Sequence, residues 1–151
     1  MYYLDNILRK ENELLESFST RFLREHQNKG GITMGLAEKL QGLVPEMDMN
    51  TAKNYCGNDD MILQIAVSSY CEQDFTGDLQ KYFDAKDVPN YQIIIHGIKS
   101  TSLTIGLTDL SEKAKALEMA CKENNVAYIE ENHAPVLALY TDILGRLKSA
   151  L

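Results

Sequence analysis

Apolar residues recur every three to four positions along nearly the whole chain. This spacing is the period of an amphipathic α-helix, and no segment shows the strict alternation of a half-buried β-strand. Prolines, which interrupt helices, occur only at Pro45, Pro89 and Pro135. The pattern predicts an all-α protein.

The N-terminal apolar stripe predicts a helix over residues 3–27, ended by Gly30 and Gly31. Its apolar positions are Leu4, Ile7, Leu8, Leu15, Phe18 and Phe22. A short turn of helix over residues 36–40 and a loop through Pro45 follow. We place a boundary in this loop, so residues 1–44 are predicted to form an N-terminal helical extension and residues 45–151 the main domain.

Four longer helices are predicted in the main domain, after a short lead-in at residues 52–55. The first extends from an N-cap at Asn58 to about residue 85, with Met61 and Ile65 among its inward residues and a bend at Gly77. The second starts after Asp87 and ends near residue 106, and it tolerates a proline in its first turn.

The third predicted helix is capped by Thr108 and broken at residues 124–125, and the fourth extends over residues 126–151 with a kink at Pro135. Cys71 and Cys121 lie on inward stripes and are predicted to be small core residues. Because the connections are short, the four helices are predicted to pack as an antiparallel up-and-down four-helix bundle.

Composition removes several classes of function. The formal net charge is −7, and an acidic surface repels phosphate backbones, so no nucleic-acid partner is expected. The apolar runs are too short to cross a bilayer, and no membrane insertion is expected. The three cysteines form no C-x-x-C pair, which argues against disulfides and a metal site. A reducing cytoplasm is therefore the expected location, and the N-terminus has no apolar region typical of a secretory signal.

The stretch IIIHGIKSTSLTIG, residues 93–106, places a histidine within an apolar helix. At about 100° per residue, His96 lies about 160° from Ile98, the centre of the inward face. Lys99 lies one turn away on the outward side, and Ile93 and Leu103 flank the histidine with apolar surface. Gln92 and Ser100 share this side. We therefore expect His96 on the outer surface of its helix.

The pattern H-x-I-K-S-x-S-x-x-I-G, which begins at His96, and the following L-x-x-x-A-x-x-L-E, which ends at Glu118, resemble the histidine-containing phosphotransfer (HPt) domain of bacterial multistep phosphorelays. The resemblance covers residues 51–151 and includes the lead-in NYCGNDD over residues 54–60, but it does not cover residues 1–44. The family most often has glycine where this chain has Ser100, which is also small enough for a partner to approach.

The resemblance implies that His96 accepts a phosphoryl group from the aspartate of one receiver domain and passes it to another. Lys99 would contact the phosphoryl group, while Ile93, Leu103, Gln92 and Ser100 would form the surface that a response-regulator receiver domain contacts. The chain would be a phosphoryl carrier without autokinase activity or a cofactor, and Mg²⁺ is expected on the partner receiver. A hybrid sensor kinase is a second candidate partner.

Two alternatives stay open from the residues alone. A sensor-kinase fragment also carries a surface histidine, but this chain lacks glycine-rich ATP-binding segments, and Gly97 stands where that family has an acidic residue. A non-catalytic helical scaffold or dimerisation domain of a sensor kinase would need no reactive histidine at all. His26 and His133 are not candidate sites, because they are expected near a helix terminus and at the core edge.

Overall fold

The computed structural model describes Arg9 and residues 35–151. This described part consists of α-helices joined by short turns and contains no β-strand, so the all-α prediction is confirmed for it. The helices are α2 (Leu36–Leu43), α3 (Met49–Cys56), α4 (Asp60–Glu72), α5 (Thr76–Asp84), α6 (Val88–Thr104), α7 (Thr108–Lys122) and α8 (Val126–Ala150). Apart from Arg9, the helix predicted over residues 3–27 lies outside the described residues.

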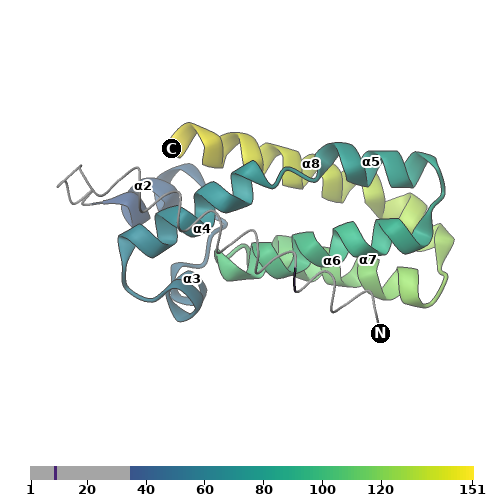
Figure 1. The fold of residues 1–151 in the computed structure, drawn as a ribbon, viewed down its shortest axis with the longest axis horizontal. Coiled ribbons are helices and arrows are strands. Elements are labelled where there is room, and N and C mark those ends of the chain that lie inside the picture. The colour runs from purple at the N-terminus through teal and green to yellow at the C-terminus, as the bar shows by residue number, and fades with distance from the viewer. Residues whose placement is uncertain (1–8, 10–34) are drawn as a thin grey trace.

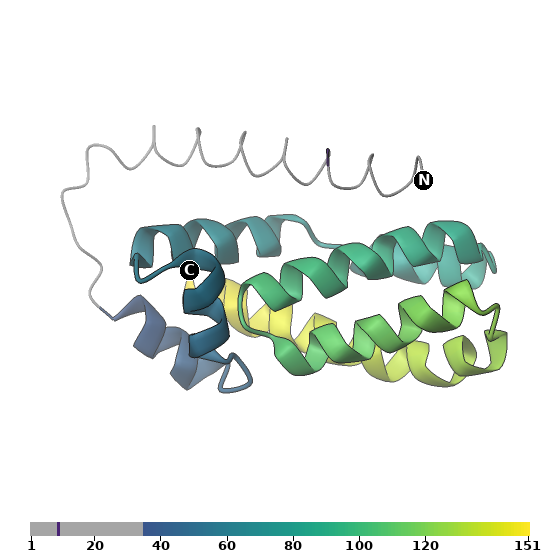
Figure 2. The same ribbon diagram turned by 90° about the horizontal axis from the view of Figure 1, so that it is seen from below.

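Helices α6 and α7 lie side by side, and α7 packs in turn on α8 (Figure 1). Helix α8, drawn in yellow, contacts α2, α4 and α5 as well. Helices α4 and α5 follow one another along one edge of the molecule (Figure 2). The turns before α6 and before α8 meet at one end, and α2, α3 and the C-terminus lie toward the other. This arrangement surrounds one hydrophobic core to which each of these helices contributes.

The inward stripe predicted for α6 is confirmed at its centre. Tyr91, Ile95 and Ile98 are at most 1% exposed. Ser102 on the same stripe is also buried, and its hydroxyl lies 2.9 Å from that of Tyr70 on α4. Because the two hydroxyls satisfy each other, a polar pair is accommodated in this core.

The single helix predicted between residues 58 and 85 is wrong, because the chain leaves helical geometry between α4 and α5. The Asp74 carboxylate accepts a hydrogen bond from the Thr76 N–H at 2.9 Å at the start of α5. The Tyr140 hydroxyl of α8 accepts from the Phe75 N–H at 3.2 Å and donates to the Gln73 carbonyl at 3.4 Å. A buried tyrosine from a distant helix thus satisfies backbone groups that the break leaves unpaired.

The inward face predicted for α4 is wrong over the first turns of the helix. Met61 is 48% exposed, and Ile65 is partly exposed. Leu63 and Val67 point into the core instead. The predicted and observed faces therefore differ over the first turns of α4 and coincide at Cys71.

Two predicted N-caps are displaced by one residue. Asp59, not Asn58, caps α4, and its carboxylate accepts from the Met61 N–H at 2.9 Å. Leu107, not Thr108, precedes α7 and makes no side-chain cap. Leu107 is 1% exposed, so its core packing fixes the chain at this turn. The predicted start of α6 is confirmed, with Asp87 as N-cap and a proline in the first turn.

The hydrophobic core extends N-terminal of the predicted boundary at residue 44. Leu40 and Val44 are completely buried in the same core as α6 and α8. The Asp48 N–H donates to the Gly106 carbonyl at 2.7 Å, which ties the start of α3 to the turn after α6. Gly106 has φ +84, and a Cβ there would lie 2.3 Å from the Asp48 carbonyl oxygen. Only glycine fits this crossing without strain.

Helix α8 begins at the predicted residue and contains Pro135 within it. Cys71 and Cys121 are buried, as predicted. Among residues 35–151, no helix has both the length and the apolar character needed to cross a bilayer.

Candidate functional site

His96 lies in the middle of α6, on the side of the helix opposite Ile98. Its side chain is 15% exposed, so the imidazole reaches the surface without standing free of it. The other residues on this side are also partly exposed: Gln92, Ile93, Lys99, Ser100 and Leu103. We call these six residues of α6 the His96 face. The outer surface expected from the sequence is thus only partly exposed, and α7 packs closely alongside it.

The acid that meets His96 comes from α7. Glu118 is only 5% exposed, and its Oε2 lies 3.1 Å from His96 Nδ1 and 2.9 Å from Lys99 Nζ. Its Oε1 lies 3.1 Å from Lys122 Nζ, one turn further along α7. One buried carboxylate therefore joins the histidine to two lysines, and we call these four residues the Glu118 cluster.

Glu118 is ionised near neutral pH. Burial raises the pKa of its carboxyl, but hydrogen bonds from Lys99, Lys122 and His96 together outweigh burial and hold that pKa below its ordinary value. An ionised carboxylate can only accept hydrogen bonds. The proton between Glu118 and His96 must therefore reside on Nδ1 of the imidazole.

This assignment leaves Nε2 of the neutral imidazole as the nitrogen with a free lone pair. Among the described residues, no hydrogen bond to His96 Nε2 is formed. The site thus holds an oriented imidazole whose second nitrogen is available to an incoming electrophile or proton.

A hydrogen bond between α6 and α7 fixes the register of the Glu118 cluster. The Ser111 hydroxyl of α7 donates to the Lys99 carbonyl of α6 at 2.9 Å, and Ser111 is buried. Glu118 lies two turns beyond Ser111 along α7, so the helix pairing that places Lys99 also places the carboxylate.

The structure brings His96 and Lys99 onto one carboxylate and leaves the rest of the His96 face around them. Sequence reasoning did not identify Glu118 and Lys122 as site residues. Glu118 ended the quoted motif, and Lys122 follows it at the i+4 spacing of a helical ion pair. That spacing was the available signal, but the contact between α7 and His96 depends on tertiary packing.

His133 does not join the Glu118 cluster. His133 is 2% exposed and buried against the Phe83 ring, with the Tyr91 hydroxyl 3.1 Å from its Nδ1. This is deeper than the core-edge position expected from the sequence. His26 lies outside the described residues. Within the described part of the chain, no three His, Cys, Asp or Glu side chains form a group that could hold a metal ion.

Comparison of the chain with models of known families, with curated proteins and with solved structures gives no match.

Proposed function

We propose that the chain is a histidine phosphotransfer module that relays a phosphoryl group between receiver-domain aspartates in two-component signal transduction. The observation that carries this proposal is the pairing of His96 Nδ1 with the buried, ionised Glu118 at 3.1 Å. That pairing leaves Nε2 as the nucleophile on a partly exposed side of α6. The HPt-like sequence pattern around His96 supports the same function.

The transfer step needs no proton to leave the ring. Nε2 of the neutral imidazole attacks the phosphorus of an aspartyl phosphate, the P–O bond to the aspartate breaks, and the aspartate departs as a carboxylate. The imidazole then carries the phosphoryl group on Nε2 and the original proton on Nδ1, so the ring becomes positively charged. Glu118 lies next to Nδ1 and stabilises that charge. Attack by a second receiver's aspartate reverses these steps.

Two lysines balance charge around the same carboxylate. Lys99 is 26% exposed and lies on the His96 face, so its ammonium is placed to turn from Glu118 toward phosphoryl oxygens. Lys122 is 52% exposed and holds the other carboxylate oxygen. Phosphoryl transfer depends mainly on positioning and charge neutralisation, and these residues supply both.

The remaining His96 face is proposed as the surface that a receiver domain contacts. Ile93 and Leu103 contribute apolar area on either side of His96, and Gln92 and Ser100 contribute polar groups. We further propose that α4 with α5, α6, α7 and α8 form the antiparallel up-and-down four-helix bundle of that family. The partners would be cytoplasmic response-regulator receivers, with Mg²⁺ on the receiver, and the chain itself would have no kinase activity.

The reactivity of His96 can be tested without a known partner by incubation with phosphoramidate, a small donor that phosphorylates imidazole. We expect acid-labile, alkali-stable phosphate on the wild type and none on His96→Gln. His133→Gln is the matched control, because its buried ring should not react and its loss should leave labelling unchanged. Labelling of His96→Gln to the wild-type level would refute the assignment of His96.

Relay is tested separately with receiver domains charged by acetyl phosphate. The proposal requires transfer of the label to the wild type and onward to a second, uncharged receiver, with neither step in His96→Gln. A helical scaffold or dimerisation domain of a sensor kinase, the alternative function, predicts no transfer from any receiver and no effect of the His96 substitution.

A further inference from the structure

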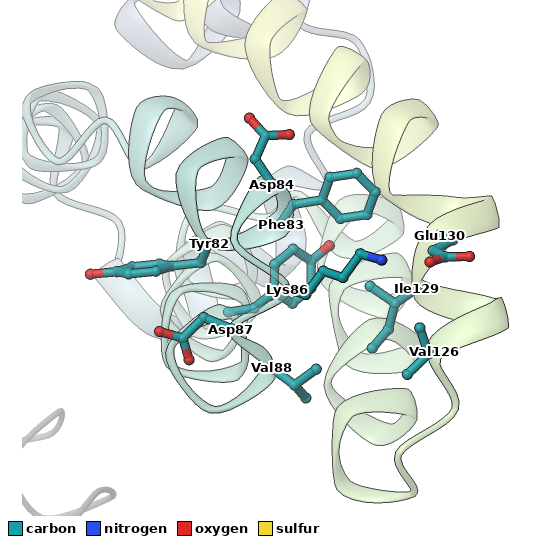
Figure 3. A pocket seen from close by; sticks show the side chains of 10 residues that line it. Tyr82, Phe83, Asp84, Lys86, Asp87, Val88, Val126, Ile129 and Glu130 are labelled. Carbon is teal, nitrogen blue, oxygen red and sulfur yellow. The ribbon is translucent and has the colours of Figure 1, made fainter.

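A cavity of about 380 Å³ lies at the end of the molecule where the turn between α5 and α6 meets the first turns of α8 (Figure 3). This volume falls within the range of ligand pockets, about 300–1,000 Å³. The residues that line it lie outside the Glu118 cluster. Tyr91, the nearest of them to His96 along α6, is about 7.5 Å away along the helix axis.

The walls of the cavity are apolar and aromatic. Val88 and Tyr91 of α6, Phe83 of α5, and Val126 and Ile129 of α8 line it. Tyr91 and Ile129 are buried core residues, whereas Val126 is 46% exposed at the mouth. The cavity thus has a floor anchored in the core and an opening to solvent, and it suits a ligand with an apolar body.

The wall is held in place by a chain of hydrogen bonds behind it. The Phe83 ring stacks on His133 at 3.8 Å, and the Tyr91 hydroxyl lies 3.1 Å from His133 Nδ1. His133 Nε2 lies 3.0 Å from Gln80 Oε1, and the Gln80 amide donates to the Asp84 carboxylate at 2.8 Å. Because these groups satisfy one another, the aromatic wall has little freedom to close the cavity.

The rim of the cavity is acidic. Asp84, Asp87 and Glu130 contribute three carboxylates and Lys86 one ammonium, a net charge of −2. Asp84 and Asp87 accept hydrogen bonds from their own helices, from Gln80 and from the start of α6. The Glu130 side chain is exposed, and within the described part of the chain it makes no ion pair or hydrogen bond.

Lys86 and Glu130 lie on opposite sides of the mouth. Figure 3 shows the Lys86 side chain extending toward α8, but no ion pair between the two is formed among the described residues. An unpaired carboxylate at the edge of a pocket lined by aromatic and aliphatic side chains favours an organic cation. The carboxylate attracts the positive charge, and the faces of the aromatic rings attract it as well.

We propose that this cavity binds a small organic ammonium ion, with its apolar body between Phe83, Val88 and Ile129 and its charged end at Glu130. An anionic ligand of the same shape would face three carboxylates and gain only Lys86. The acidic rim therefore selects the cation.

The test uses three probes of one shape and different charge: phenethylammonium, 2-phenylethanol and 3-phenylpropionate. Each is titrated at pH 7 into the full chain, and methyl resonances are followed by NMR. We expect saturable shifts of the Val88, Val126 and Ile129 methyls, with Val67 on α4 unaffected, and affinity in the order cation, alcohol, anion. An anion that binds as tightly as the cation, or the lack of saturable shifts at these methyls, overturns the proposal.

Substitutions on the rim test the role of Glu130. One surface charge pair is worth about 0.2–1 kcal/mol, so Glu130→Gln should weaken phenethylammonium binding about 1.5- to 5-fold. Lys86→Gln should strengthen it by a similar factor. Glu131→Gln is the matched control, because it removes the same charge from the next residue of α8, which does not line the cavity. Equal effects of Glu130→Gln and Glu131→Gln would show attraction by net charge alone and would overturn the assigned site.

Discussion

Replacement of Glu118 by glutamine removes one charge from the centre of the Glu118 cluster while nearly preserving shape. The amide retains one oxygen that still accepts hydrogen bonds, but the nitrogen that replaces the other oxygen only donates. The wild-type carboxylate accepts from three partners, His96, Lys99 and Lys122. At least one lysine must therefore lose its buried acceptor in Glu118→Gln.

The cost follows from the exposure of each partner. Removal of one member of a fully buried ion pair costs about 3–5 kcal/mol, because the other charge is left unpaired. Lys99 and Lys122 are 26% and 52% exposed, so both ammonium groups can turn to water, and their share falls toward the 0–1 kcal/mol of a surface pair. With the weakened bond to His96 included, we expect a loss of about 1–2 kcal/mol in the free energy of unfolding.

Urea unfolding followed by circular dichroism measures this loss, and imidazole ¹⁵N shifts report the tautomer of His96. Glu112→Gln is the matched control, because Glu112 is exposed on α7 and should change stability by less than about 0.5 kcal/mol. We expect wild-type His96 to carry its neutral-state proton on Nδ1 and Glu118→Gln to reduce that preference. An unchanged tautomer ratio together with unchanged stability would refute the deduction that Glu118 orients His96.

Other substitutions test packing and titration elsewhere. Gly106→Ala should lower the free energy of unfolding in urea by at least about 1–2 kcal/mol, because the positive φ of Gly106 and the nearby Asp48 carbonyl exclude a Cβ. Gly97→Ala should raise it by about 0.5–1 kcal/mol, because a Cβ within this helix would meet Phe75 at an ordinary 3.5 Å. A more stable Gly106→Ala than Gly97→Ala would contradict the backbone geometry. Burial lowers the pKa of His133 from its ordinary 6.5 despite the opposing charge of Asp84, so the unfolded chain binds the extra proton first. The free energy of unfolding should therefore fall as the pH drops below 6.5, by at most about 1.4 kcal/mol per pH unit. Between pH 7 and 5.5 the free energy of unfolding should fall less in His133→Gln than in the wild type, and equal falls would exclude His133 as the cause. Leu103→Ala should slow phosphoryl transfer from a phosphorylated receiver domain. It should lower the free energy of unfolding by only about 1 kcal/mol, because Leu103 is partly exposed. A loss of several kcal/mol would show that Leu103 is a core residue.

Local rules were enough to predict much of the fold. The start of α6 follows from Asp87 and Pro89, and that of α8 from the turn at residues 124–125, because capping and turn chemistry act over a few residues. The inward stripe of α6 follows from its long isoleucine-rich period. These features depend on neighbours in sequence, which is the information that a single chain displays.

Two N-caps, predicted at Asn58 and Thr108, were displaced by one residue on local rules alone, whereas the larger failure lies where a distant residue takes part. The break between α4 and α5 depends on Tyr140, whose hydroxyl supplies partners to two backbone groups more than 60 positions earlier in the chain. No glycine or proline marks the position, because Gly77 lies beyond it within α5, and the local signal is the Asp74 carboxylate that accepts from the Thr76 N–H.

In the candidate site, too, the features set by local sequence were predicted and the one set by tertiary packing was not. Helical phase was enough to place His96 opposite the core-facing stripe with Lys99 one turn away. Phase on α6 alone carries no information on what α7 presents to that side. Glu118 was visible in the motif, but its contact with His96 follows from the helix pairing held by Ser111 and the Lys99 carbonyl.

The charge of the Glu118 cluster differs in sign from that of the whole chain. With His96 neutral, Glu118, Lys99 and Lys122 sum to +1, on a chain whose formal charge is −7. Burial of the carboxylate and exposure of the ammonium groups orient this charge, so that the cations are the groups able to move toward an anion at the surface. Transfer of a phosphoryl group to Nε2 adds negative charge to that surface and positive charge to the ring. The lysines are placed to neutralise the negative phosphoryl group, and Glu118 is placed to neutralise the positive ring. Each charge that the proposed step creates therefore meets an opposite charge already in position.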